Sequence, residues 1–147
     1  MDNIREVRAE DKEIFIAMLD EFYHSEAVLH PVPYENYENV FQEVVFSKQY
    51  MDAYLFTLDN EIAGFTTLAK TFSTEVGGQV IWIEELYIKK QFQSKGLGRK
   101  IFPFIEKTYP NVKRIRLEVE SDNEKAIKLY EKMGFEVLAY SQMIKDM

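Results

Sequence analysis

An apolar segment at residues 80–88 runs directly into a basic, glycine-spaced loop, which then opens a helix pattern. The segment reads ValIleTrpIleGluGluLeuTyrIle and is the longest and most apolar strand pattern in the chain. The loop at residues 93–98 reads GlnSerLysGlyLeuGly, and the helix pattern after it runs to about Tyr109. A strand that passes through a short loop into a helix is typical of an α/β-type sheet with helical crossovers.

The rest of the chain completes this architecture. Two helix patterns with apolar residues at the i, i+3, i+4 spacing follow a short strand at residues 3–8. From Ala53 the period changes to two, and two strands flank a hairpin turn at Asp59 and Asn60. A strand at residues 114–120, a helix ending near Gly134 and one or two strands in residues 135–144 follow. We therefore predict an α/β fold: a mixed sheet of six to seven strands with about four helices.

Composition narrows the class of protein. The chain has 147 residues, which predicts one domain, residues 1–147. Its net charge of −7 and pI near 4.9 argue against a nucleic-acid partner. It has no cysteine, which excludes a thiol nucleophile and thiolate metal ligands. Because no apolar stretch approaches the roughly 18 residues of a membrane helix, we expect a cytoplasmic protein with no membrane partner.

The glycine-spaced loop predicts an anion site. Successive backbone N–H groups at a helix N-terminus lack intrahelical acceptors and lie at the positive end of the helix dipole. The chain carries 25 acidic residues against 18 basic ones, yet residues 86–105 contain none of the acids. That window holds five basic residues: Lys89, Lys90, Lys95, Arg99 and Lys100. A positive patch on an acidic protein indicates a phosphate-bearing ligand.

Two common phosphate motifs do not fit. In a dinucleotide-binding fingerprint the third glycine would fall on Ile101, and the chain has no GlyLysSer or GlyLysThr of a P-loop. On its own, the loop is also compatible with a tight turn that binds nothing.

The surrounding residues resemble the GNAT superfamily of N-acetyltransferases. The family pattern Gln/Arg-x-x-Gly-x-Gly/Ala is matched by Gln93, Gly96 and Gly98 directly after an apolar strand. A second family signature follows about 25 residues later, and the order of elements agrees over essentially the whole chain. The matching residues of that signature are Asn123, Ala126, Tyr130, Gly134 and Phe135.

The resemblance implies acetyl-coenzyme A as co-substrate, held in a cleft between splayed parallel strands at residues 80–89 and 114–120. The backbone of Leu86, Tyr87 and Ile88 would pair with the pantetheine arm. Asn123 would touch that arm, although it could instead only cap its helix. The pyrophosphate would lie on the loop, with Lys95 and Arg99 as side-chain contacts. The loop residues implied are Gln93, Ser94, Lys95, Gly96, Leu97, Gly98 and Arg99.

Three residues are candidates for catalysis. Glu84 and Glu85 interrupt the apolar strand, where a charge is costly to bury. Adjacent strand residues point to opposite faces, so only one enters the cleft unless a bulge intervenes. We favour Glu84 as general base, since the family often has an acid there; either residue could instead bind a cationic acceptor. By resemblance, Tyr130 would protonate the departing thiolate or, alternatively, only pack in the core.

The expected activity is direct transfer of an acetyl group to a primary amine of a small molecule, cationic like a polyamine or an aminoglycoside. Protein lysine or N-terminal acetylation is an alternative, as is a coenzyme-A-binding sensor without turnover. His24 and His30, the only histidines, are poor evidence for a metal, and none is expected. An apolar C-terminal strand could pair across a homodimer.

Overall fold

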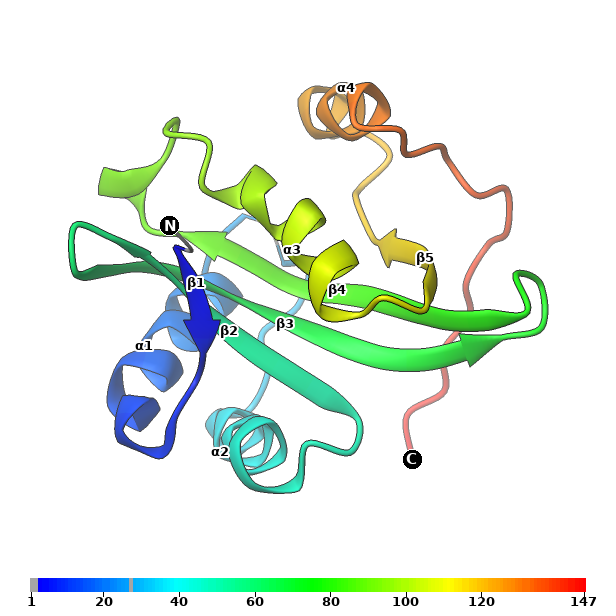
Figure 1. The fold of residues 1–147 in the computed structure, drawn as a ribbon. Coiled ribbons are helices and arrows are strands. Elements are labelled where there is room, and N and C mark those ends of the chain that lie inside the picture. The colour runs from blue at the N-terminus through cyan, green and yellow to red at the C-terminus, as the bar shows by residue number, and fades with distance from the viewer. Residues whose placement is uncertain (1–2, 27) are drawn as a thin grey trace. The chain divides into compact units, whose positions relative to one another are not determined.

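The structure is a computed structural model that describes residues 3–26 and 28–147. The chain divides into two compact units, residues 1–117 and residues 118–147. The first unit contains the sheet and three helices, and the second contains α4 (Glu124–Lys132) (Figure 1). The three helices of the first unit are α1 (Lys12–Tyr23), α2 (Tyr34–Gln42) and α3 (Ile101–Thr108).

Within the described residues, the sheet has five strands in the order β1-β2-β3-β4-β5. The first four are antiparallel neighbours, whereas β4 and β5 run parallel, joined by a crossover through α3. Asp59 and Asn60 have φ values of 51° and 64°, the left-handed pair that a two-residue type I′ hairpin requires. The predicted mixed α/β sheet is confirmed. The strands are β1 (Ile4–Glu6), β2 (Met51–Leu58), β3 (Glu61–Ser73), β4 (Gly78–Ile88) and β5 (Val112–Leu117).

Two helices cover one face of this sheet. The helices α1 (Lys12–Tyr23) and α2 (Tyr34–Gln42) pack their apolar sides on β2 and β3, and a π-helical turn, Glu43–Ser47, extends α2. Phe15 of α1 and Phe65 of β3 are both fully buried, with ring centroids 5.5 Å apart. Full burial of one such side chain contributes about 1.5–3 kcal/mol, so this face holds the main core.

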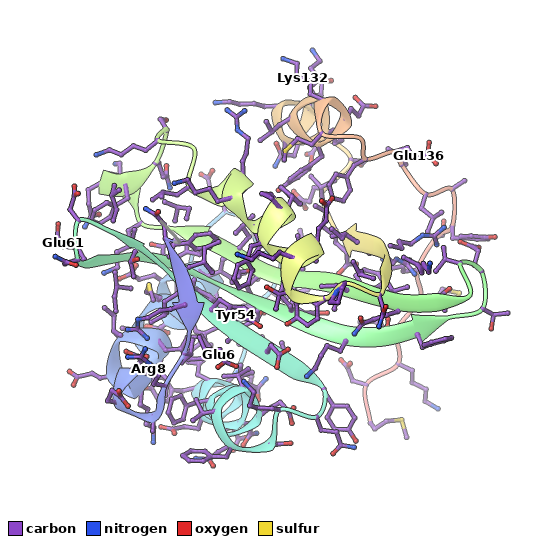
Figure 2. The ribbon with its side chains drawn as sticks, in the orientation of Figure 1. Glu6, Arg8, Tyr54, Glu61, Lys132 and Glu136 are labelled. Carbon is purple, nitrogen blue, oxygen red and sulfur yellow. The ribbon has the colours of Figure 1, made fainter. Side chains whose placement is uncertain are left out.

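The helix α3 (Ile101–Thr108) covers the opposite face. Tyr54 of β2 reaches this side, where its ring lies 4.7 Å from that of Phe104 (Figure 2). Its hydroxyl lies 3.0 Å from the hydroxyl of Tyr109, which donates to Asp52 Oδ2 at 2.6 Å. Asp52 also forms an ion pair with Lys70 Nζ at 3.1 Å. This buried polar network ties the end of α3 to β2.

The expected strands in residues 135–144 are wrong. The described residues beyond α4 contain neither helix nor strand, so the sheet has five strands rather than six to seven. The apolar side chains that produced the strand pattern, among them Val137, Tyr140 and Ile144, are exposed. A strand requires a neighbour for its backbone groups, which alternation alone does not supply. The expected homodimer therefore lacks the strand on which it was based.

In the described part of the chain, none of the helices combines the length and apolarity needed to cross a membrane.

Candidate active site

The pairing between the strands β4 and β5 ends about halfway along β4. Their parallel pairing ends at Ile83 and Leu117, whereas β4 continues to Ile88. Among the described residues, no strand pairs with residues 84–88 on the side away from β3. The backbone of this segment is therefore open to an added strand or an extended ligand.

A β-bulge marks the same point. Thr67 pairs with Glu85 and Leu68 pairs with Ile83, so Glu84 is one extra residue in β4. A bulge places two successive residues opposite one partner and changes the direction in which side chains point. The condition under which both glutamates could serve one site is thus met.

Glu85 is buried against α1, with 6% of its surface exposed. Tyr23 donates its hydroxyl to Oε2 of Glu85 at 2.6 Å, and Thr67 of β3 donates its hydroxyl to Oε1. Burial raises the pKa of Glu85, and the hydrogen bonds from Thr67 and Tyr23 partly oppose that rise. The result is a carboxyl group that holds a proton more readily than an ordinary glutamate.

Glu84 is exposed, in contrast to its neighbour. Burial raises the pKa of Tyr23, and the negative charges of Glu85 and Glu84 raise it further. The charge of Glu84 therefore acts on the Tyr23 hydroxyl together with that of Glu85, whose carboxylate accepts a hydrogen bond from it.

Further tyrosines and acidic side chains lie near Tyr23 and on the same strand as the two glutamates. The rings of Tyr23 and Tyr37 are 6.1 Å apart, and Tyr37 hydrogen-bonds Asp20, which adds to the effect of burial in raising the pKa of Tyr37. Tyr87 donates to Glu21 at 2.6 Å; burial, followed by that hydrogen bond, raises the pKa of Tyr87 to about 12. The sequence indicated neither the role of Tyr23 nor that of Thr67, because their link to Glu85 depends on tertiary contact.

The glycine loop follows the C-terminal end of β4 after a short 3-10 turn, Lys90–Phe92. Gln93 donates its side-chain amide to the carbonyl of Ile88 at 2.9 Å, which returns the loop to β4. Ser94 and Gly96 have φ values of 63° and 77°, so the chain reverses twice in the left-handed region. A 3-10 turn, Gly98–Lys100, then leads into α3, and its N–H groups come at the start of that helical segment.

Gly96 and Gly98 are glycines for different reasons. Gly96 has a left-handed backbone, which side chains rarely adopt. Gly98 does not, and a Cβ there would lie 3.9 Å from Ile88 Cγ1 and 4.0 Å from Leu86 Cδ2, an ordinary contact. The protein itself would accept a side chain at Gly98, so the open surface there is available to a ligand.

The remaining predicted residues lie in the second unit. Asn123 caps α4, accepting a hydrogen bond from the N–H of Ala126 at 3.2 Å, which is the capping role that the sequence left open. Tyr130 is half-buried, and its ring lies 5.8 Å from that of Phe135. Gly134, with φ of 94°, ends the helix, and the N–H of Phe135 donates a hydrogen bond to the carbonyl of Tyr130. This is a Schellman motif with its apolar contact. Burial raises the pKa of Tyr130.

A sequence comparison decides the family. A sequence model of the Acetyltransferase (GNAT) family matches residues 12–135, which include the bulge, the glycine loop and α4. The chain belongs to the GNAT family. Membership places it among the acetyl-transferring proteins and confirms the resemblance found in the sequence.

Individual relatives agree with the family assignment. The chain is 32% identical over 59 residues to the spermine/spermidine N(1)-acetyltransferase of Bacillus subtilis (strain 168), covering 38% of this chain and 39% of that protein. The chain thus matches well under half the length of this curated relative. This GNAT protein is also similar to solved structures. A possible acetyltransferase from Clostridium difficile 630 has a TM-score of 0.82 at 18% identity, covering 98% of this chain and 96% of that one.

A second solved structure is that of AAC(6')-Iy in complex with the bisubstrate analog CoA-S-monomethyl-acetylneamine. Its TM-score is 0.78 at 13% identity, covering 98% of this chain and 97% of that one. At these identities the two structures establish a common fold.

Proposed function

We propose that this GNAT protein transfers an acetyl group from acetyl-coenzyme A to a primary amine of a small, cationic molecule. The observation that carries the proposal is the open edge of β4 at residues 84–88, which leads directly into a loop with an unobstructed glycine at Gly98. An extended pantetheine arm would pair with the backbone of Leu86, Tyr87 and Ile88. Its pyrophosphate would lie on the N–H groups of residues 93–98.

The residues present suit the coenzyme. The loop side chains at Lys95 and Arg99 are exposed, and residues 86–105 contain no acid that would repel phosphate. Bound acetyl-coenzyme A would supply an activated thioester carbonyl. An N–H near Leu86 would stabilise negative charge on the carbonyl oxygen. With no cysteine in the chain to form an acetyl-thioenzyme, direct transfer in a ternary complex is favoured.

The acceptor side of the proposal is supported by charge. Glu84 is exposed and its charge acts on Tyr23, and Asp20 and Glu21 accept hydrogen bonds from neighbouring tyrosines. Carboxylates among aromatic rings favour an ammonium group with an aliphatic chain. The spermine/spermidine relative and the AAC(6')-Iy complex are similar to this chain and agree with an amine acceptor of this kind.

A panel of amines tests the function. Thiol release from acetyl-coenzyme A would be measured with polyamines, aminoglycosides, and peptides carrying a free N-terminus or lysine. We expect turnover with polyamines or aminoglycosides, and coenzyme A should protect the protein against thermal unfolding. Protection without turnover on any amine would instead favour a sensor, and turnover confined to peptides would favour a protein acetyltransferase.

Tyr130 is the proposed acid that protonates the departing sulfur. Because a thiolate is a good leaving group, we expect Tyr130→Phe to lower kcat by about tenfold, or about 1.4 kcal/mol, with little change in coenzyme affinity. Steady-state kinetics together with coenzyme titration would measure both. The phenylalanine keeps the ring contact with Phe135, so unchanged turnover would remove the acid role.

A further inference from the structure

The two glutamates at the bulge differ in environment in a way that separates their tasks. Glu85 is 6% exposed, and both its oxygens accept hydroxyl hydrogen bonds, neither from a cation. Glu84 is exposed to solvent. An acceptor amine approaching from solvent can meet the exposed Glu84 directly, whereas Glu85 is buried and both of its oxygens already accept hydroxyl hydrogen bonds.

One of these two donors is Tyr23. It is half-buried and sits at the C-terminal end of α1, with its hydroxyl 2.6 Å from Glu85 Oε2. A phenol oxygen keeps lone pairs while its proton is donated, so it can accept one proton as it gives up another. Because its side chain is only partly buried, Tyr23 connects the buried carboxylate of Glu85 with a more exposed position.

We propose that Tyr23 relays the proton of the acceptor ammonium to Glu85, and that Glu84 holds the ammonium by its charge. This assignment rests on the proposed acetyl transfer. The sequence favoured Glu84 as the base; the contacts of the bulge favour Glu85 instead.

The proton transfers balance. One ammonium proton passes to Oη of Tyr23 while the Tyr23 hydroxyl proton passes to Oε2 of Glu85. The freed nitrogen lone pair attacks the thioester carbonyl; the C–N bond forms and the C–S bond breaks. The departing sulfur takes the hydroxyl proton of the proposed acid Tyr130. The nitrogen then loses its second proton, which restores the proton that Tyr130 gave up. Glu85 then returns its proton to solvent through Tyr23, so each turnover releases one proton.

Glu85 is suited to this task on electrostatic grounds. Burial raises its pKa, and a general base works best when its pKa lies nearer the working pH. Among the described residues, the charged or titratable groups that act on the Tyr23–Glu85 pair are Glu84 on β4 and Tyr37 on α2. Activity needs the ionised carboxylate of Glu85. We therefore expect kcat to fall as the pH decreases through the pKa of Glu85, which lies above the pKa of an ordinary glutamate.

Thr67 provides a test that does not remove the relay. Its hydroxyl hydrogen bond favours the ionised form of Glu85, so its loss must raise the pKa of that group. We expect Thr67→Val to move the acidic limb of the kcat profile to higher pH with the plateau preserved. Thr67→Ser, which restores a hydroxyl, should return the limb to its original position.

The relay itself is tested by kinetics of whole-chain variants. Tyr23→Phe and Glu85→Gln should each lower kcat about a hundredfold, and the double variant should be no slower than either, because the two act as one unit. Glu84→Gln should raise the KM of the amine with kcat little changed. Tyr54→Phe also removes a hydrogen-bonded tyrosine hydroxyl, but on the opposite face, and should keep full activity.

The outcomes separate the two proposals. Coenzyme-dependent thermal stabilisation of each variant would confirm that it is folded. Turnover that persists in folded Tyr23→Phe with an unchanged pH profile would overturn the relay alone, as would loss of the acidic limb in Glu84→Gln. Absence of thiol release by the unmodified protein with every amine would overturn the proposed function and the relay with it.

Discussion

Replacing Gly98 by valine should abolish most coenzyme A binding while leaving the fold intact. The backbone at this position is not left-handed, and a Cβ would meet only Ile88 and Leu86 at ordinary contact distance. The added side chain would instead occupy the surface that a pyrophosphate would approach. We expect affinity to fall about a hundredfold, equivalent to about 2.8 kcal/mol.

Thermal unfolding with and without coenzyme A measures this loss. At a coenzyme concentration of about one hundred times the original Kd, ligand stabilisation should drop from about 2.7 to about 0.4 kcal/mol. Gly98→Ala should give an intermediate loss.

Gly77→Asn is the matched control for Gly98→Val. Gly77 lies in the connection from β3 to β4 with φ of 64°, and nothing lies within 4 Å of its Cβ position. Asparagine tolerates that backbone, so coenzyme binding should not change. Undiminished coenzyme stabilisation in Gly98→Val would show that the loop is only a turn.

The second large effect is expected on stability, from Asp52→Ala. Asp52 is 6% exposed and accepts the hydroxyl of Tyr109, while pairing with Lys70. Its removal would take the carboxylate acceptor from the buried phenol of Tyr109 and leave the largely buried ammonium of Lys70 with the carbonyl of Lys48 and no paired anion. Breaking a buried ion pair by removing one partner costs about 3–5 kcal/mol, a large share of the stability of a domain this size.

Urea denaturation followed by tyrosine fluorescence or circular dichroism would measure this loss. Glu61→Ala, at the exposed turn between β2 and β3, should change stability by less than about 0.5 kcal/mol (Figure 2). If Asp52→Ala lowered the stability by as little as Glu61→Ala, water would replace the Asp52 carboxylate at little cost.

Much of the fold follows from local pattern. The hairpin at Asp59 and Asn60 was predictable because these residues tolerate the left-handed backbone, and α1 because Phe15, Met18 and Leu19 recur at helical spacing. The strands expected after α4 were wrong, because alternation in residues 135–144 specifies a face but not a partner.

The candidate site was predictable only in part. The glycine loop follows from local chemistry, since helix starts and glycines are recognisable in sequence. The bulge is not, because it depends on how Thr67 and Leu68 pair with β4. Tyr23 lies 62 residues from Glu85 in the chain, and only the packing of α1 on the sheet brings their side chains together. For the same reason the sequence could favour Glu84 over Glu85 only on the family pattern.

The extra residue in β4 also has a consequence for engineering. Alternation on either side of Glu84 follows opposite parity, so Ile83 and Glu85 occupy different faces although two positions separate them. Deleting Glu84 would restore a regular ladder and keep Glu85 next to Tyr23, whereas straightening the strand without a deletion would carry Glu85 to the α3 face. A redesign of acceptor preference by grafting residues from a relative must therefore align the two proteins at this residue first. An offset of one position would put the exposed Glu84 in the place of the buried Glu85.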